Sequence, residues 1–190
     1  MLYPEFNEII RKRLDDYRYK HSLAVADEAV KLAEKYGADK NRAYLAGLLH
    51  DITKNDSYDN HLKIFKEFGI ILTELENNAP NLWHAMSGAA YVQYVLNIDD
   101  ADVVSAIRYH TTAKAGMTLL QKIIYLADFT SSDRNYPDVD IMRSLAESDM
   151  DAAILYAVKL TINKLTKANT AIHPDTFEAY NNIVNSKKSI

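Results

Sequence analysis

Apolar residues recur at helical spacing along this chain, whereas the alternating pattern of a half-buried β-strand is nearly absent. Successive segments carry start or stop signals of helices. Pro4 can begin a first helix, Gly37 can end a second, and Asp39 can cap a third. Only five glycines and four prolines interrupt the 190 residues. The sequence therefore predicts an all-α bundle of roughly eight to ten helices.

Length and composition place the chain in the class of ordinary globular proteins. One domain over residues 1–190 could bury a sizeable core, and the polar tail 185–190 is expected to fray. A net charge of −4 argues against a nucleic-acid partner. No apolar run approaches the roughly 18 residues of a membrane span, and the N-terminus does not resemble a signal peptide. We therefore expect a cytoplasmic protein with no membrane partner.

Six ionisable side chains interrupt apolar helical faces, namely His21, His50, Asp51, His84, His110 and Asp128. Taken singly, a histidine on such a face is usually a hydrogen-bonded core residue, and an aspartate such as Asp128 usually caps a loop. Taken together, six such side chains buried without partners would each cost desolvation free energy, and binding to one or two shared divalent cations would offset this cost. The chain has no cysteine, so nitrogen and oxygen ligands favour iron or manganese over structural zinc.

The stretch LAGLLHDITK, residues 45–54, contains two of these side chains and predicts their surroundings. The small residues Ala46 and Gly47 precede the His50–Asp51 pair and are expected to leave room beside it. Lys54 follows Asp51 by three residues and should project over the same patch. Elsewhere, His61 has no partner in the sequence pattern and is expected at the surface.

The order of these residues resembles the H…HD…D pattern of the HD-domain metal-dependent phosphohydrolases. Longer strings make the resemblance more specific, and they span residues 18–176 in the order RYKHSLAVADEA, LAGLLHDITK, WHAMSGA, AIRYHTT, KIIYLADF…R and IHPDT. Together they resemble the bacterial HD-domain symmetrical dinucleoside tetraphosphatases. That family cleaves diadenosine tetraphosphate into two ADP, so the resemblance implies a single HD domain with this activity.

The resemblance also implies roles for individual residues. One iron would be bound by His21, His50, Asp51 and Asp128. Asp51 would bridge to a second ion held by His84 and His110, or those two histidines would face the substrate phosphate. Manganese, cobalt or nickel would suit the same ligands. Substrate contacts are expected from Lys54, Asn55, Thr111, Arg134 and His173, although His173-Pro174 reads equally well as a helix-entry turn.

The implied reaction is attack by metal-bound hydroxide beside the middle of the tetraphosphate. Asp51 would orient the water, and Lys54 and Arg134 would neutralise phosphate charge. Two departures from the family pattern concern the nucleotide contacts. The loop reads FTSSDR, where the family commonly has an acidic residue and a proline before the arginine, and Tyr180 stands where an arginine is expected.

Other functions fit parts of the same pattern. Another HD phosphohydrolase could act on a nucleotide, a cyclic dinucleotide or an alarmone. More remote alternatives are a di-iron oxygenase, a regulatory HD protein without catalysis and a purely structural bundle. The 13 tyrosines would suit a homodimer interface, a tyrosine-rich core or nucleotide stacking equally well, so the oligomeric state is not determined by the sequence.

Overall fold

The computed structural model describes residues 3–186, and within that range the chain is all-helical. Eleven α-helices lie in this range, all but α5 at least eight residues long. Their bounds are α1 Pro4–Arg13, α2 Asp16–Tyr36, α3 Lys40–Leu49, α4 Tyr58–Glu67, α5 Glu74–Asn77, α6 Trp83–Ala90, α7 Ala101–Tyr109, α8 Leu119–Thr130, α9 Val139–Ser148, α10 Met150–Lys167 and α11 Pro174–Ser186. A 3₁₀ turn, η1 Pro80–Leu82, precedes α6, and a π-helical turn, η2 Tyr91–Val95, follows it. The predicted all-α bundle is confirmed. Among the residues described, no helix is long and apolar enough to cross a membrane.

The helix ends follow the start and stop signals in the sequence. Pro4 opens α1, and Gly37 ends α2 in the left-handed conformation with φ 75°. The carboxylate of Asp39 accepts two backbone N–H groups at the start of α3. Thr118 and Gln121 form a reciprocal capping box at the start of α8. These local interactions explain why helix positions were readable from the sequence.

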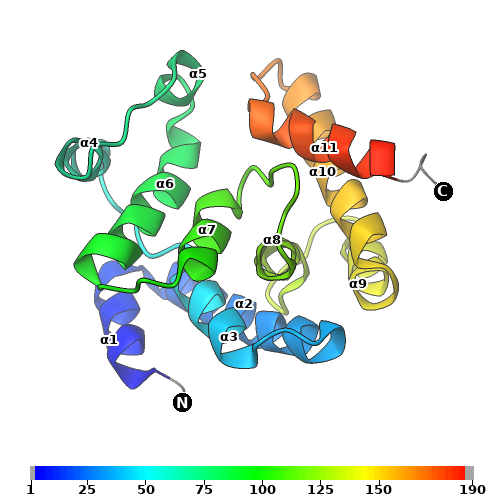
Figure 1. Ribbon diagram of the computed structural model, residues 1–190, viewed down its shortest axis with the longest axis horizontal. Helices are drawn as coiled ribbons and strands as arrows, with labels where there is room; N and C mark the ends of the chain where they lie inside the picture. Colours follow the sequence, from blue (N-terminus) through cyan, green and yellow to red (C-terminus); the bar gives the residue numbers. More distant parts are fainter. Residues whose placement is uncertain (1–2, 187–190) are drawn as a thin grey trace.

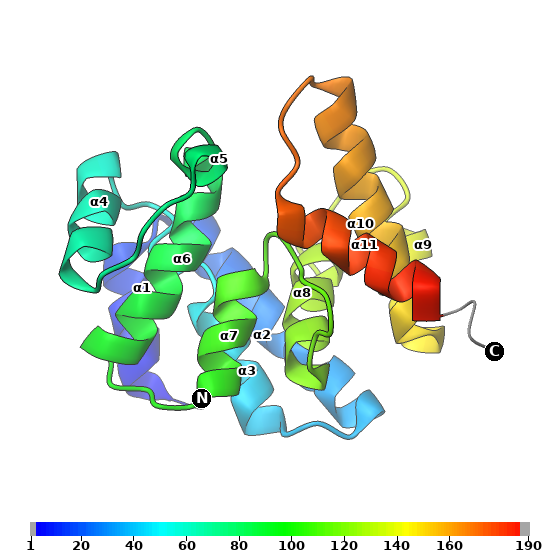
Figure 2. The same cartoon turned by 45° about the horizontal axis from the view of Figure 1, so that its top comes forward.

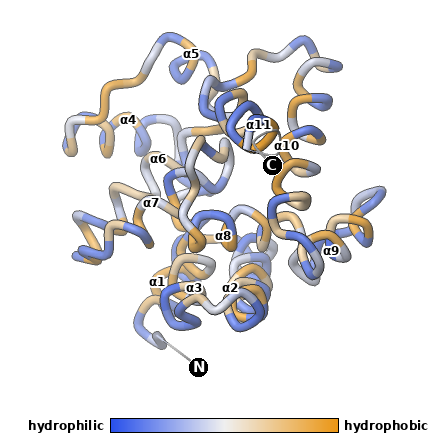
Figure 3. The backbone as a smooth tube through the Cα atoms, turned by 45° about the vertical axis from the view of Figure 1, so that its right-hand side comes forward, coloured by the Kyte–Doolittle hydropathy of each residue, from blue (hydrophilic) through white to orange (hydrophobic). Residues whose placement is uncertain are grey.

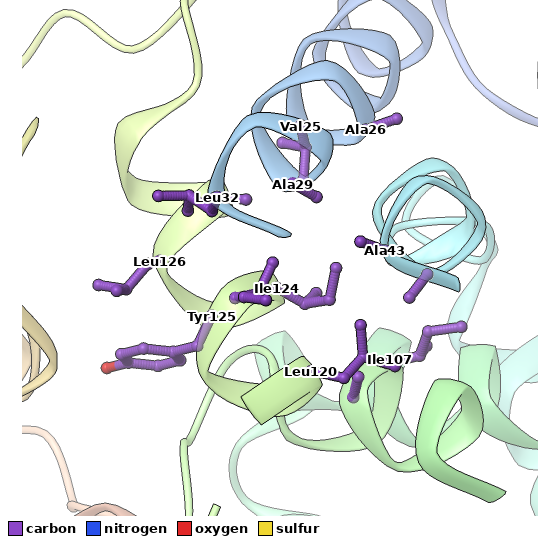
Figure 4. Close-up of a cluster of buried hydrophobic side chains, with 14 of the residues drawn as sticks. Val25, Ala26, Ala29, Leu32, Ala43, Ile107, Leu120, Ile124, Tyr125 and Leu126 are labelled. Carbon is purple, nitrogen blue, oxygen red and sulfur yellow. The ribbon is translucent and has the colours of Figure 1, made fainter. Parts of the chain in front are cut away.

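The helices form a central group flanked by two others (Figures 1 and 2). Helices α2, α3, α7 and α8 pack against one another, with α4–α6 on one side and α9–α11 on the other. Apolar side chains of the central helices meet in a common core, which Figure 4 shows around Ile124. Hydrophobic and hydrophilic positions alternate around the helical turns in Figure 3, as expected for amphipathic helices.

The small residues of α3 bring two helices into close contact. A Cβ atom at Gly47 would lie 2.8 Å from the Cα atom of Ala26 and 3.1 Å from the carbonyl oxygen of Val25, both in α2. Ala46 is fully buried in the same core. The prediction that these small residues leave room for a ligand is wrong at Gly47, because backbone of α2 fills that space. The close approach instead brings the end of α3 beside the middle of α2.

Helix α4 folds back onto α6 and covers a smaller apolar cluster of Phe65, Trp83 and Met86. His61 belongs to this contact, with 6% of its surface exposed and its Nδ1 atom 2.8 Å from the Ser87 hydroxyl. Burial lowers the pKa of His61. The prediction of a surface histidine is wrong because its partner comes from a different helix.

The predicted fraying tail overlaps the last helix. Residues 185 and 186 are the end of α11, and the Ser186 hydroxyl donates to the carbonyl oxygen of Ile183 at 2.8 Å. Residues 187–190 lie outside the part of the chain that the structure describes.

Candidate metal centre

The structure brings the six ionisable residues of the apolar faces together at one place. His21 lies on α2, His50 ends α3, Asp51 follows it, His84 lies on α6, His110 ends α7, and Asp128 lies on α8. The first five residues are at most 4% exposed. The Asp128 side chain is 19% exposed. Packing of α2, α3, α6, α7 and α8 therefore creates the cluster.

The nitrogen and oxygen atoms of this cluster form overlapping groups. One group is His21, His50 and Asp51, a second is Asp51, His84 and His110, and a third is His50, His110 and Asp128, with the ligand atoms of each within 4.8 Å of one another. Asp51 Oδ1 lies 3.2 Å from Nε2 of His84 and 3.6 Å from Nε2 of His110. Ligand atoms about 2.1 Å from a shared ion lie about 3 to 3.5 Å apart. The observed spacing therefore fits a divalent cation, and Asp51 belongs to two of the groups.

Backbone carbonyl groups fix the orientation of two of the imidazole rings. His50 Nδ1 donates to the carbonyl oxygen of Gly47 at 2.7 Å, and His110 Nδ1 donates to that of Ile107 at 2.7 Å. A carbonyl oxygen only accepts, so a neutral ring held this way presents the lone pair of Nε2 to the cluster. Among the described residues, His50 Nε2 is buried and has no hydrogen-bond partner. An orphaned buried nitrogen of this kind is what a metal ion would satisfy.

Protonation states in the cluster suit metal binding. Burial lowers the pKa of His50 and the pKa of His84 to about 4, so both rings are neutral at pH 7. Burial alone would raise the pKa of Asp51, but its contacts with the imidazoles of His50, His110 and His84 outweigh it and hold that pKa well below its usual value. Neutral imidazoles and an ionised carboxylate are the forms that ligate metals. The donor set therefore fits a divalent metal ion.

Asp133 contacts the cluster from the loop after α8, and sequence reasoning missed it. Its Oδ2 atom accepts a hydrogen bond from His21 Nδ1 at 2.8 Å, and its Oδ1 atom accepts from the Ser131 hydroxyl at 2.7 Å. The opposite nitrogen of His21, Nε2, lies 3.0 Å from Asp128 Oδ1. A carboxylate behind a ligating histidine orients the ring and raises its basicity. The available signal was an acidic residue directly before Arg134, in the loop that otherwise departs from the family pattern.

Three cationic side chains surround the cluster. Arg134 binds the carboxylate of Asp128 and donates from Nε to the Asp128 carbonyl oxygen at 2.6 Å. Lys54 Nζ lies 3.0 Å from Nε2 of His84, and burial lowers the pKa of Lys54. Arg18 Nη1 donates to Asp51 Oδ2 at 3.1 Å. Arg18 was not among the predicted site residues, although it lies one turn before His21 on the same helix.

Two other predicted substrate contacts, Asn55 and Thr111, differ in the exposure of their side-chain polar groups. Asn55 is exposed, and both ends of its side chain bond to Asp15: its Oδ1 accepts from the Asp15 backbone N–H at 3.0 Å, and its Nδ2 donates to Asp15 Oδ2 at 2.9 Å. Thr111 follows His110, and its hydroxyl is buried without a hydrogen-bond partner among the described residues.

His173 lies at the start of α11 and faces a different helix. Its Nε2 atom lies 3.4 Å from Glu76 Oε1, while its Nδ1 atom accepts the Asp175 backbone N–H at 3.2 Å. The Thr176 hydroxyl donates to the carbonyl oxygen of Thr112 at 2.9 Å. The segments IHPDT and HTT, far apart in the sequence, therefore lie side by side next to His110.

Comparisons with known proteins agree with this geometry. The family described as "HD domain" matches residues 18–133, a range that includes all six cluster residues. Two proteins named "Bis(5'-nucleosyl)-tetraphosphatase, symmetrical" are similar over most of their length. The one from Bacillus subtilis (strain 168) is 39% identical, over 92% of this chain and 94% of the relative. The one from Halalkalibacterium halodurans is 36% identical, over 95% and 96% respectively. The crystal structure of a "predicted HD superfamily hydrolase involved in NAD metabolism" from Clostridium acetobutylicum superposes with a TM-score of 0.94 at 35% identity, covering 97% of both chains.

Proposed function

This chain belongs to the HD-domain family and, within it, to the symmetrical bis(5'-nucleosyl)-tetraphosphatases, and we propose that it hydrolyses diadenosine tetraphosphate to two ADP and also acts on related dinucleoside polyphosphates. The observation that carries the proposal is the buried cluster in which Asp51 belongs to two groups of metal-ligand atoms. Identity of 39% and 36% to two such phosphatases over more than nine-tenths of the chain supports the substrate class.

The charges around the cluster suit a polyphosphate. Three carboxylates and three cations cancel in formal charge, namely Asp51, Asp128 and Asp133 against Arg18, Lys54 and Arg134. A bound divalent metal ion therefore leaves a net positive centre for an anionic substrate. Such an ion lowers the pKa of a coordinated water and polarises a phosphoryl oxygen. Iron is our proposal for this ion, with manganese, cobalt and nickel as alternatives for nitrogen and oxygen ligands.

The residues around the cluster have separate proposed roles in metal binding, water orientation and phosphate binding. We propose that His21, His50 and Asp128 hold the ion together with Asp51, whose carboxylate also orients the attacking water. The partly buried ammonium of Lys54 is suited to neutralise a phosphate as a point charge, and the planar guanidinium of Arg134 can bind two phosphate oxygens.

Three further histidines and one threonine complete the proposed site. His84 and His110 would bind a second ion with Asp51 or contact a phosphate directly. Thr111 and His173 would contact one nucleotide, a role supported by the hydrogen bond that joins their two segments. Asn55 would act through its bonds to Asp15, by fixing the turn that carries Lys54.

The domain organisation and the assembly are proposals of the same kind. The main apolar core includes residues from Ile10 in α1 to Ile183 in α11, which supports one HD domain over residues 1–190. That the protein forms a homodimer and that it is located in the cytoplasm are predictions from the sequence alone.

A product assay tests the function. Protein purified without chelator is analysed for metal, loaded with iron(II) or manganese(II), and incubated with diadenosine tetraphosphate. Two ADP per substrate support the proposal, whereas ATP plus AMP, or no turnover, would reject it. Asp51→Ala should lose both metal and activity, and Asp140→Ala should lose neither, because that carboxylate is 91% exposed on α9. Activity that survives in Asp51→Ala without bound metal would reject the role of the metal.

A further inference from the structure

The four imidazole rings of the cluster form a chain of edge-on contacts with two distinct ends. Ring centroids are 5.2 Å apart for His21 and His50, 5.0 Å for His50 and His110, and 5.1 Å for His110 and His84. Lys54 lies at the His84 end, where its Nζ atom contacts that ring. The proposed nucleotide contacts Thr111 and His173 are near His110. At the His21 end, Arg134 Nη2 lies 3.2 Å from His21 Nε2 and is a proposed phosphate contact, but no nucleotide contact has been proposed there.

The aromatic ring of Tyr17 continues the row of imidazole rings beyond His21. Tyr17 lies one turn earlier on α2, with its ring centroid 6.3 Å from that of His21 and the two ring planes only 7° apart. The row of histidine rings is therefore followed by a parallel aromatic ring at Tyr17. Tyr17 is 57% exposed, so much of its ring is open to a ligand. Asp15 caps α2 and bonds to Asn55, which holds this first turn of the helix against the turn after Asp51.

A cationic group lies next to this aromatic ring. The guanidinium carbon of Arg18 lies over the Tyr17 ring, 5.4 Å from its centroid, and Arg18 Nη1 is 3.1 Å from Asp51 Oδ2. An exposed aromatic ring with an arginine next to it combines the two features that bind nucleotides, a surface for base stacking and donors for phosphate oxygens.

We propose that Tyr17 and Arg18 form a subsite for the second nucleotide of the substrate, with the base stacked on Tyr17 and its phosphate bound by Arg18. This inference rests on the proposed function, because symmetrical cleavage leaves a nucleoside diphosphate on each side of the broken bond. One nucleoside diphosphate then lies toward Thr111 and His173. The other lies beyond His21, and the row of histidines between them faces the central phosphates.

Counting the ADP molecules bound per chain tests the subsite without any turnover. The manganese-loaded protein is titrated with ADP by calorimetry, in wild type, Tyr17→Ala and Tyr94→Ala. Tyr94 is a matched control because its ring is 52% exposed and stacks on Phe68. We expect two ADP per chain in wild type and in Tyr94→Ala, and one in Tyr17→Ala. One ADP per chain in wild type, or two with unchanged affinities in Tyr17→Ala, would overturn the subsite.

A kinetic comparison separates stacking from support of His21. Stacking of one base predicts that Tyr17→Ala raises KM for diadenosine tetraphosphate roughly 5- to 150-fold, while KM for adenosine 5'-tetraphosphate, which has one base, stays within about two-fold. Tyr17→Phe should restore the KM of wild type. If Tyr17→Ala instead weakens manganese binding and both substrates equally, Tyr17 only positions His21 and the subsite is wrong. Failure of the proposed function is distinct, since wild type would then produce no ADP whatever the number of ADP sites.

Discussion

Replacing Asp133 with alanine should weaken metal binding while leaving the fold intact. The change removes the carboxylate that accepts the hydrogen bond of His21 Nδ1 at 2.8 Å. The His21 side chain is fully buried, so water does not readily take the place of this partner. Without it, nothing on that side fixes the tautomer and orientation that direct Nε2 towards Asp128.

The size of the effect follows from the environment of this hydrogen bond. A hydrogen bond to a charged group contributes about 1.5 to 3 kcal/mol, and losing the outer partner of a ligating histidine costs about 10- to 100-fold in metal affinity. The Asp133 side chain is 24% exposed, so water screens part of its charge. We therefore expect the lower part of that range, about 10- to 30-fold.

The measurement is calorimetric titration of metal-free protein with manganese(II). Wild type, Asp133→Ala and Asp140→Ala are compared, because Asp140 loses the same charge from a 91% exposed position beside Arg143. Thermal unfolding followed by circular dichroism shows that each variant is folded. Ser131→Ala should have a smaller effect, since the Ser131 hydroxyl only positions the other oxygen of Asp133.

Two results would refute this reasoning. A manganese affinity of Asp133→Ala within about two-fold of wild type would show that the hydrogen bond does not orient a ligand. An equal loss in Asp140→Ala would show that net charge, and not the contact with His21, controls the affinity.

Three further predictions follow from the packing and the charges. Gly47→Ala should lower the free energy of unfolding by about 1 to 3 kcal/mol in a urea titration, because its Cβ would lie 2.8 Å from the α2 backbone; a change below about 0.5 kcal/mol would contradict the close packing. Lys54→Met should reduce kcat/KM for the tetraphosphate about 10- to 100-fold without loss of metal content, and lost metal would show a structural role instead. The metal-free protein should lose stability as pH falls from 6.5 towards 4, because His50 and His84 have a pKa of about 4 in the folded chain but 6.5 when unfolded, so the unfolded state binds more protons. The raised pKa of His21 acts in the opposite sense, since its stabilisation is present below pH 6.5 and is lost as pH rises through the folded value. His84→Asn should flatten the acid limb of the unfolding curve, and an unchanged slope would contradict the assignment.

Helix positions were readable from the sequence because they depend on interactions within a few residues. The Asp39 cap, the Thr118 capping box and the left-handed Gly37 each act on their own helix terminus. Periodicity likewise identified which helical faces are buried. It thereby singled out His21 and His110 as polar residues in apolar surroundings, and the fold places them in one cluster with the other four.

Local signals could also mislead, as the small residues of α3 show. Within its own helix, the missing side chain of Gly47 suggests free space. The structure shows that the backbone of Ala26 in the neighbouring helix fills this space.

The sequence by itself determined the helical class, the helix ends and the six polar residues that interrupt apolar faces, because spacing and capping are properties of short segments. Only the tertiary structure decided the partners of those residues. His21 and Asp133 are 112 positions apart, and His61 and Ser87 are 26 positions apart. No periodicity links such pairs, since their contact depends on how α8 packs on α2 and how α4 folds back onto α6. The same packing selects Arg18 and Tyr17 for the His21 side of the metal centre.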